Sequence, residues 1–229
     1  MSELTDTTMI PVDVSTTYLG LHLTSPIVAS ASPVSGDPAR WESLEQAGAG
    51  AIVLPSLFEE QIVSEAFALD ASLDLGTETF AESLSYLPEI EQYDVGPARH
   101  LALVEQARER LTIPVIASLN GTSVGWWVQY AHHLETAGAQ AIELNVYDVI
   151  SDPRQSAADV ERRYLDLVEE VRAVVTVPVA VKLGPWFTSL GHFALALQSA
   201  GADGLVLFNR LYQPDIDLET LDVTPRLQL

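Results

Sequence analysis

The sequence predicts an α/β fold, namely a TIM-type (β/α)8 barrel of which this chain contains about six βα units. Short, continuous apolar segments alternate with longer segments of helical character, which is typical of a parallel sheet covered by helices. The pattern also recurs at a constant length. Pro114 and Pro178 are 64 positions apart, and Gly138 and Gly201 are 63 positions apart. A repeating βαβα module of this kind favours a barrel over an open, doubly wound sheet.

Two kinds of strand alternate along the chain. The first kind has a proline at its entry, where the missing N–H costs no ladder hydrogen bond. The second kind follows an Ala-Gly-Ala, in which the glycine suits the left-handed residue that ends a helix. The first kind is predicted at 25–29, 113–117 and 177–181, and the second kind at 51–54, 141–144 and 204–208.

The segments between these strands are predicted helices, and they cover 38–47, 98–111, 124–137, 157–175 and 189–200. The strand count reaches six, and 209–229 carries no apolar strand–helix–strand pattern. We therefore expect 1–229 to form a single, incomplete barrel domain that lacks about a quarter of the wall of a complete barrel. Either the chain is a fragment, or its open sheet closes against another chain.

Composition excludes several classes of function. The net charge of −21 repels nucleic acid and anionic lipid, so neither is an expected partner. No apolar run approaches the roughly 20 residues that span a bilayer, and 1–14 lacks the features of a signal peptide, so we expect a cytoplasmic protein. The absence of cysteine removes disulfides and thiol nucleophiles. The five histidines lack zinc-ligand spacing and are interpreted as surface or packing residues without a metal.

Lys182 is the only lysine of the chain, and it lies inside the apolar run 177–183. Surfaces normally use lysine freely, because an ammonium group is cheap in water and costly when buried. A single lysine at the end of a buried strand therefore points to a functional ammonium group. The alternative is a lysine that extends its charged end from the strand into solvent.

Polar residues follow the ends of the predicted strands, and in a barrel these ends form the active-site mouth. They include Ser30, Asn120, Asn145, Lys182 and Asn209. An asparagine amide offers both a donor and an acceptor, which suits a planar heterocycle, and a lysine stabilises negative charge that develops on such a ring. Asparagines also cap helices and tolerate loop geometry, which explains any single one of them.

The same stretches resemble the dihydroorotate dehydrogenase family. The opening segments 18–21 and 25–32 are similar to the start of that family, and 142–146, 179–183 and 201–209 are similar to its fourth, fifth and sixth strands. The run 54–61, Leu-Pro-Ser-Leu-Phe-Glu-Glu-Gln, resembles the branch of dihydroorotate dehydrogenase-like proteins.

The resemblance implies an FMN-binding barrel that transfers hydride from a dihydropyrimidine-like substrate to the flavin. It implies that Lys182 contacts the flavin near N1 and O2, where it stabilises the negative charge of the reduced ring. Asn145 would lie between flavin and substrate, and Asn209 would contact the substrate. Ser30 and Ala31 would line the dimethylbenzene side of the flavin, and Asn120 would be a further flavin contact.

The sequence departs from the family pattern at three positions. Pro55 occupies the place of a flavin-side lysine, Asp148 that of the catalytic general base, and Ile150 that of a substrate asparagine. Asp148 accepts a proton if burial raises its pKa, and otherwise it is a solvated loop residue. The family also holds the FMN phosphate at the loops after strands seven and eight, which this chain lacks.

An acidic insertion is expected at about 57–97, where ten acidic residues occur without a lysine or arginine. Its first part, 58–69, is predicted to be an amphipathic helix, and the remainder is a lid, a docking surface or a solvated face. Two other functions stay open: a Schiff-base aldolase or lyase that uses Lys182, and a non-catalytic barrel that binds a redox partner. The expected partners are a small-molecule substrate and either a second copy of the chain or a redox protein.

Overall fold

The structure of the protein is a computed structural model that describes residues 12–59, 97–121, 123–146 and 152–209, together with the backbone of 212–216 and 223–227. The predicted acidic insertion and Asp148 therefore fall largely or wholly outside the described residues. Among the described residues, no helix is both long and apolar enough to cross a membrane.

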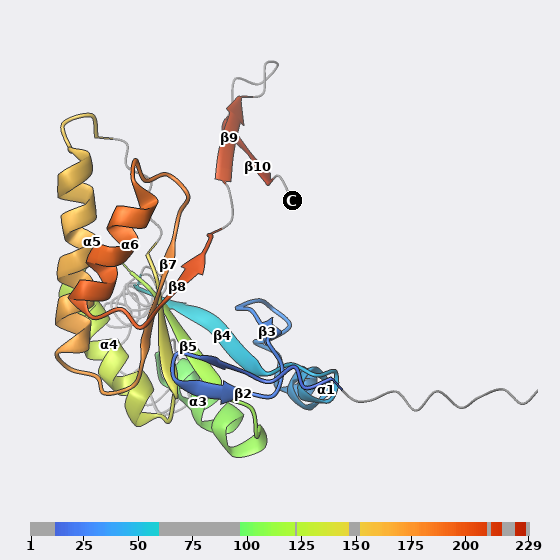
Figure 1. Ribbon diagram of the computed structural model, residues 1–229. Helices are drawn as coiled ribbons and strands as arrows, with labels where there is room; N and C mark the ends of the chain where they lie inside the picture. Colours follow the sequence, from blue (N-terminus) through green and yellow to red (C-terminus); the bar gives the residue numbers. More distant parts are fainter. Residues whose placement is uncertain are drawn as a thin grey trace, which may run out of the picture.

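A curled sheet of six parallel strands forms the centre of the molecule (Figure 1). Its strand order follows the chain without a crossover, β3-β4-β5-β6-β7-β8, and each neighbouring pair is parallel. A doubly wound sheet reverses its strand order at a switch point, whereas a barrel winds in one direction. The prediction of a partial TIM-type barrel is therefore confirmed. The strands are β3 (Val28–Ala29), β4 (Ala51–Phe58), β5 (Val115–Asn120), β6 (Ala141–Asn145), β7 (Val179–Leu183) and β8 (Gly204–Leu207).

Five described helices alternate with these strands, and α4, α5 and α6 line one side of the sheet in Figure 1. All five predicted helices exist within a few residues of their predicted ends, although the first begins with a 3₁₀ turn at Pro38–Arg40. The helices are α1 (Trp41–Gln46), α3 (Pro97–Arg110), α4 (Val124–Thr136), α5 (Ala157–Arg172) and α6 (Leu190–Ala200).

Alternation along each strand divides the apolar residues between two cores. Ile52, Ile142 and Val181 face outward and pack with the helices in the larger core. Val53 and Ala180 face inward and belong to the smaller core. Because both faces of the sheet are buried, the strands read as continuous apolar runs rather than as alternating ones.

A short antiparallel hairpin covers the inner face. It consists of β1 (Thr16–Tyr18) and β2 (Leu21–Leu23), which were not predicted as strands. Leu19 and Leu23 of this hairpin are buried in the inner core. Leu19 also packs close to Gly204 of β8, where a Cβ atom would lie 2.6 Å from the Leu19 side chain. The hairpin therefore closes the inner core from the side opposite the helices.

The proline-type strands begin later than predicted. β5 begins one residue after Pro114, β7 one residue after Pro178, and β3 two residues after Pro26. Proline has no N–H to donate to the ladder, so it precedes the strand instead of forming part of it. Its carbonyl still takes part: Pro114 O accepts from Ile52 N at 3.0 Å, and Pro178 O accepts from Ile142 N at 2.9 Å.

The Ala-Gly-Ala prediction is confirmed at all three positions. Gly48, Gly138 and Gly201 have φ values of 95°, 99° and 109°. In each case the next alanine donates its N–H to the carbonyl of a leucine five residues earlier, at 3.0 to 3.1 Å. This is the Schellman arrangement, in which a left-handed glycine lets the chain satisfy the last carbonyls of a helix.

A glutamate near the end of two helices ties each helix to the entry of a later strand. Glu45 of α1 accepts from the backbone of Thr112 and Ile113, and Glu135 of α4 accepts from the backbone of Thr176 and Val177. The predicted βαβα repeat thus extends to a repeated tertiary contact.

The C-terminal segment contains a second antiparallel hairpin that was not predicted. It consists of β9 (Tyr212–Ile216) and β10 (Val223–Leu227), whose register places Pro214 opposite Pro225. The prediction searched for an apolar strand followed by a helix. An antiparallel hairpin needs neither, because its strands connect by a short loop and tolerate polar residues.

Candidate functional site

Polar side chains gather on the inner face of the sheet near the carboxyl ends of its strands. The sheet register places Asn145 of β6 beside Lys182 of β7, and Ser118 of β5 beside Glu143 of β6. Glu143 and Asn145 share a face because side chains two residues apart in a strand point the same way. The predicted residues Asn145 and Lys182 are therefore neighbours on adjacent strands.

A bulge in β4 brings Ser56 to the same face. The register between β4 and β5 shifts between Val53 and Ser56, so that three steps in β4 match two steps in β5. The extra residue reverses the alternation, and Ser56 points inward where it would otherwise point to the helices. Its Oγ lies 2.8 Å from the Oγ of Ser118. Pro55, the residue that departs from the family pattern, lies within this bulge.

Lys182 forms a nearly buried ion pair with Glu143. The Lys182 Nζ lies 3.5 Å from Glu143 Oε1, and the two side chains are 18% and 5% exposed. Ser118 Oγ also donates a hydrogen bond of 3.2 Å to this carboxylate oxygen. Sequence reasoning missed Glu143, although the signal was present as one acidic residue in the apolar strand 141–144.

This ion pair borders a cavity of about 430 Å³ on the inner face. The cavity lies between the β1–β2 hairpin and the sheet, and most of its wall is apolar. Burial raises the pKa of the Tyr18 phenol, and the negative charge of Glu143 raises it further. The hydroxyl of Tyr18 therefore stays protonated at neutral pH. The lining side chains include Tyr18, Ser30, Val53, Ile116, Glu143 and Lys182.

Asn145 carries a buried polar atom that lacks a partner among the described residues. Its Nδ2 donates to Ser56 Oγ at 3.4 Å, whereas its Oδ1 is buried without a hydrogen bond. An unsatisfied buried acceptor is costly unless a ligand or water supplies a donor. A planar heterocycle with N–H groups, beside an ammonium group and an apolar wall, fits this set of atoms.

The structure places the other predicted residues around this centre. Ser30 lines the same cavity as Lys182, and Ala31 packs against the inner core. Asn209 is buried, its backbone N–H donates to Leu183 O at 2.7 Å, and its Nδ2 lies 3.5 Å from Val146 O. Asn120 is the last residue of β5, the strand next to β6, and its register partner is Phe58 of β4.

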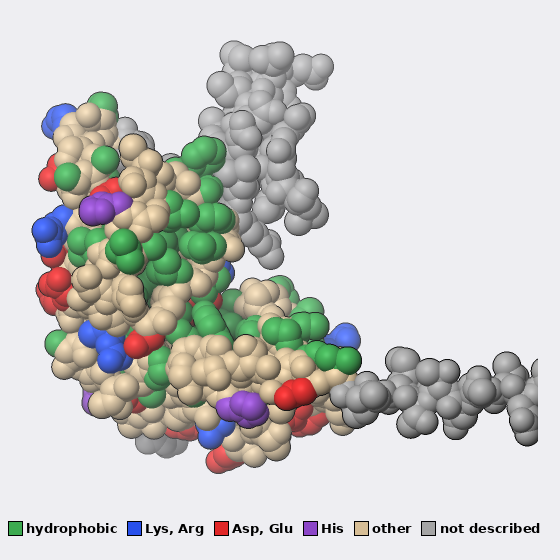
Figure 2. Space-filling model, viewed as in Figure 1, with side chains coloured by type: hydrophobic (Ala, Val, Ile, Leu, Met, Phe, Trp, Pro, Cys, Tyr) green, Lys and Arg blue, Asp and Glu red, His purple; other side chains and the backbone are tan. Residues whose placement is uncertain are grey.

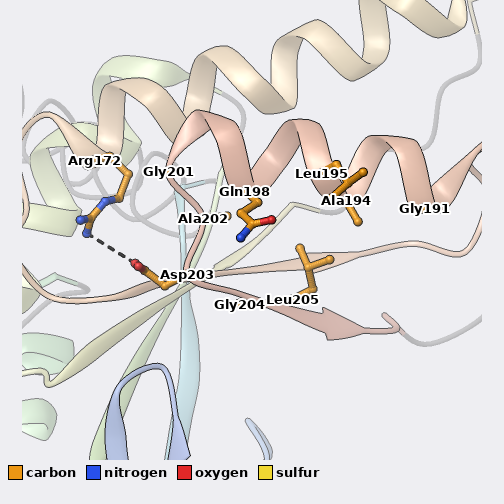
Figure 3. A pocket seen from close by; sticks show the side chains of 10 residues that line it. All are labelled: Arg172, Gly191, Ala194, Leu195, Gln198, Gly201, Ala202, Asp203, Gly204 and Leu205. Atoms are coloured by element: carbon orange, nitrogen blue, oxygen red, sulfur yellow. Dashed lines mark ion pairs between the residues drawn. The ribbon is translucent and has the colours of Figure 1, made fainter.

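A second hollow lies on the outer side of β8 against α6 (Figure 3). Its charged groups are already engaged. Arg172 pairs with Asp203 at 3.7 Å and donates to Val177 O at 2.7 Å, while Asp203 accepts from Val179 N at 2.9 Å. Among the described residues, no cluster of three or more histidine, aspartate or glutamate side chains suits a metal ion. The inner-face cavity is therefore the stronger candidate for a chemical site.

Comparison with known proteins agrees with the sequence resemblance. The family model described as dihydroorotate dehydrogenase matches residues 94–227. The catalytic subunit of dihydroorotate dehydrogenase B (NAD(+)) from Endomicrobium trichonymphae is 32% identical over 131 residues, which cover 52% of this chain and 40% of that protein. The corresponding subunit from Bacillus pumilus is 34% identical over 122 residues, 49% of this chain and 37% of that protein.

An archaeal protein gives a similar match. A putative dihydroorotate dehydrogenase A (fumarate) from Aeropyrum pernix is 35% identical over 121 residues, which cover 51% of this chain and 38% of that protein. The matched part thus spans about two fifths of the length of these relatives. The family model covers more than half of the present chain, including β5 to β8 and the residues Asn145, Lys182 and Asn209. The chain therefore belongs to the dihydroorotate dehydrogenase family.

Proposed function

We propose that this protein is an FMN-dependent oxidoreductase that takes hydride from a dihydropyrimidine-like substrate. The observation that carries the proposal is the pair of neighbours on the inner face, Lys182 and Asn145, one a nearly buried cation and the other an amide with an unpartnered buried oxygen. Membership of a family named for a dehydrogenase supports redox chemistry at this face.

The residues that would hold FMN are Lys182, Asn145, Ser30, Ala31 and Asn120. When bound, FMN supplies the hydride acceptor, which no side chain of this protein provides. Lys182 and Ser30 line one cavity, most of whose wall is apolar. An ammonium group that is largely buried stabilises nearby negative charge more strongly than it does in water.

The substrate would lie against Asn145 and Asn209. Asn209 follows β8, its backbone N–H is bonded to Leu183 at the end of β7, and its Nδ2 lies 3.5 Å from Val146 O, just after β6. Both amides therefore lie at the carboxyl end of the sheet. Their donors and acceptors match the alternating N–H and C=O groups of a dihydropyrimidine. We propose Asp148 as the group that accepts the substrate proton. An isoleucine at position 150 favours a substrate other than dihydroorotate itself.

A partner protein is part of this proposal. Two of the relatives are named catalytic subunits. We propose that electrons leave this chain through a second protein or a second copy. Mixing the reduced protein with candidate acceptor proteins and following the return of the flavin absorbance tests this part separately.

The first test is the absorbance spectrum of the purified protein, followed by release and identification of any chromophore. We expect flavin absorbance and close to one FMN for each chain. Lys182→Met should weaken FMN binding at least tenfold, because an uncompensated Glu143 carboxylate then faces the electron-rich part of the ligand. Arg162→Met, which removes an exposed charge on α5, is the matched control and should leave the affinity unchanged.

Two results would contradict the proposal. One is a colourless protein that fails to take up added FMN. The other is a borohydride-trapped adduct on Lys182 after incubation with a keto acid, because a Schiff base at this lysine would indicate aldolase or lyase chemistry.

A further inference from the structure

Glu143 is a buried carboxylate that the proposed reaction does not use. It lies within β6 on the inner face, two residues before Asn145, with its side chain 5% exposed. Among the described residues, its carboxylate contacts the ammonium of Lys182 at 3.5 Å and the hydroxyl of Ser118 at 3.2 Å. Burial of a charge is costly, and an ion pair seldom repays that cost in stability alone.

The surroundings of the pair argue against a purely structural role. The two cores on the faces of the sheet are built from aliphatic and aromatic side chains. The pair lines the inner-face cavity instead of the packed interface with the helices. Replacement of a buried ion pair by apolar residues of similar size is often neutral or stabilising, so stability alone does not account for this pair.

We propose that Glu143 is a positioning residue that fixes the Lys182 ammonium and reduces the positive charge it presents to the bound cofactor, and so sets the reduction potential of FMN. This inference rests on the proposed function. It assigns to one side chain a role that neither the family resemblance nor the chemistry of the cofactor specifies.

The sign of the effect follows from electrostatics. Reduction of a flavin adds negative charge, which a nearby cation favours and a nearby anion opposes. Lys182 and Glu143 together present almost no net charge. Removal of the carboxylate leaves an uncompensated cation, which favours the reduced form and raises the potential. Removal of the ammonium leaves an uncompensated anion, which lowers it.

Ser118 and Ser56 hold the carboxylate in place. Ser118 donates to Glu143 and also lies 2.8 Å from Ser56, which in turn accepts from Asn145. Four residues on three strands thus form one hydrogen-bonded chain that ends at the unpartnered Oδ1 of Asn145. The carboxylate therefore has little freedom to leave Lys182.

The decisive experiment is a redox titration of the FMN-loaded protein. Glu143→Gln keeps the size of the side chain and its contact with Ser118 but removes the charge. At a fixed solution potential, we expect the ratio of reduced to oxidised flavin to rise at least tenfold, which is equivalent to about 30 mV for a two-electron couple. Lys182→Met should shift the ratio in the opposite direction. Glu105→Gln, at an exposed carboxylate of α3, is the control and should not shift it.

A second measurement needs no cofactor. Thermal unfolding of the FMN-free protein is compared for Glu143→Gln, Lys182→Met and the double variant. If the two side chains form the pair seen here, the double variant is less destabilised than the sum of the single changes. If Glu143→Gln does not fold, Glu143→Asp is the substitute, because it retracts the charge by one methylene. It should raise the reduction potential of FMN by less than Glu143→Gln would, and it should keep part of the coupling to Lys182.

The outcomes separate the two proposals. Wild-type protein that does not bind FMN overturns the proposed function and this inference together. Normal FMN binding with an unchanged or lowered potential in Glu143→Gln overturns only the role of Glu143. Additive destabilisation in the FMN-free protein also overturns it, because it means that Glu143 does not hold Lys182.

Discussion

At the scale of single residues, His100 of α3 is a partly buried imidazole with a lowered pKa. Burial lowers its pKa to about 4, and its Nε2 has no hydrogen-bond partner among the described residues. The folded protein therefore holds this side chain neutral, whereas the unfolded chain protonates it near pH 6.5. Stability from this residue is fully present above pH 6.5 and is lost as the pH falls toward 4.

We expect His100→Leu to flatten the decline of stability between pH 6.5 and 4. Between pH 6.5 and 4, wild type should lose at most about 3 kcal/mol more unfolding free energy than the variant, since one pKa unit corresponds to about 1.4 kcal/mol. Urea unfolding at a series of pH values measures it. His22→Leu, at an exposed histidine of β2, should leave the pH profile of wild type unchanged. An equal slope in both variants would rule out His100 as the cause.

At the scale of elements, Gly50 controls the contact between β3 and β4. A Cβ atom at this position would lie 2.0 Å from the carbonyl oxygen of Ser25, and its N–H donates to Ile27 O at 2.7 Å. Because the obstacle is backbone, no side-chain rotation relieves it. The Ser25-Pro26-Ile27 entry to the first parallel strand must therefore shift if any larger residue replaces this glycine.

We predict that Gly50→Ala destabilises the protein by on the order of 3 kcal/mol, a value expected of a severe local clash. Gly125→Ala is the matched change. It lies in α4, where a Cβ atom would meet nothing within 4 Å, and it should stabilise by roughly 0.5–1 kcal/mol. Thermal and urea unfolding of both variants tests the pair. A small loss of stability in Gly50→Ala would mean that Gly50 does not lie in close contact with the Ser25 backbone.

Glu135 holds α4 to the entry of β7. Burial raises the pKa of Glu135, but hydrogen bonds from Thr176 and Val177 outweigh that effect and leave the pKa below its usual value. Stability from these bonds is present above the usual glutamate pKa and is lost as the pH falls through the lower, folded-state value.

Glu135→Ala should cost about 1–2 kcal/mol at pH 7, because two backbone N–H groups and the Thr176 hydroxyl lose their acceptor. The loss relative to wild type should shrink as the pH falls through the lowered folded-state pKa, because protonation of the wild-type carboxylate then weakens the same bonds. Glu170→Ala, on the exposed face of α5, is the control and should cost less than 0.5 kcal/mol or so. Chemical denaturation at pH 7 and pH 3 gives the comparison.

At the scale of the whole molecule, the sheet has an apolar edge beside β8. In the described part of the chain β8 pairs with β7 alone, and Leu195 of α6 and Leu207 of β8 are 64% and 53% exposed. Figure 2 shows hydrophobic side chains gathered over this side of the molecule. An unpaired strand next to exposed apolar side chains is a surface that favours association.

We expect the purified chain to associate as its concentration rises, and Leu195→Glu with Leu207→Glu to shift it toward the monomer. Charges along an edge strand oppose pairing with another chain. Sedimentation velocity over a range of concentrations measures the shift. Val174→Glu places the same charge at an exposed apolar residue that follows α5, and it should not change the association. A wild-type protein that stays monomeric at high concentration would contradict the prediction.

Much of the fold was predictable from the sequence because its signals are local. A glycine that ends a helix, a proline that precedes a strand and an apolar run of strand length each act within a few residues. Their repetition indicated a barrel before any contact was known. The unusual position of Lys182 was visible in the same way, because one lysine in an apolar strand needs no partner to be noticed.

Only the tertiary structure decided which side chains meet. The β4 bulge turns Ser56 inward, the β6–β7 register sets Asn145 beside Lys182, and Lys182 reaches Glu143 across the same two strands. Register and bulges are determined by the packing of the whole sheet, so a linear pattern does not contain them. The two hairpins escaped prediction for a related reason: their short, partly polar strands are defined by the partners they pair with. The sequence by itself therefore determined the barrel and its lysine, and the packed sheet determined the charge that this lysine faces.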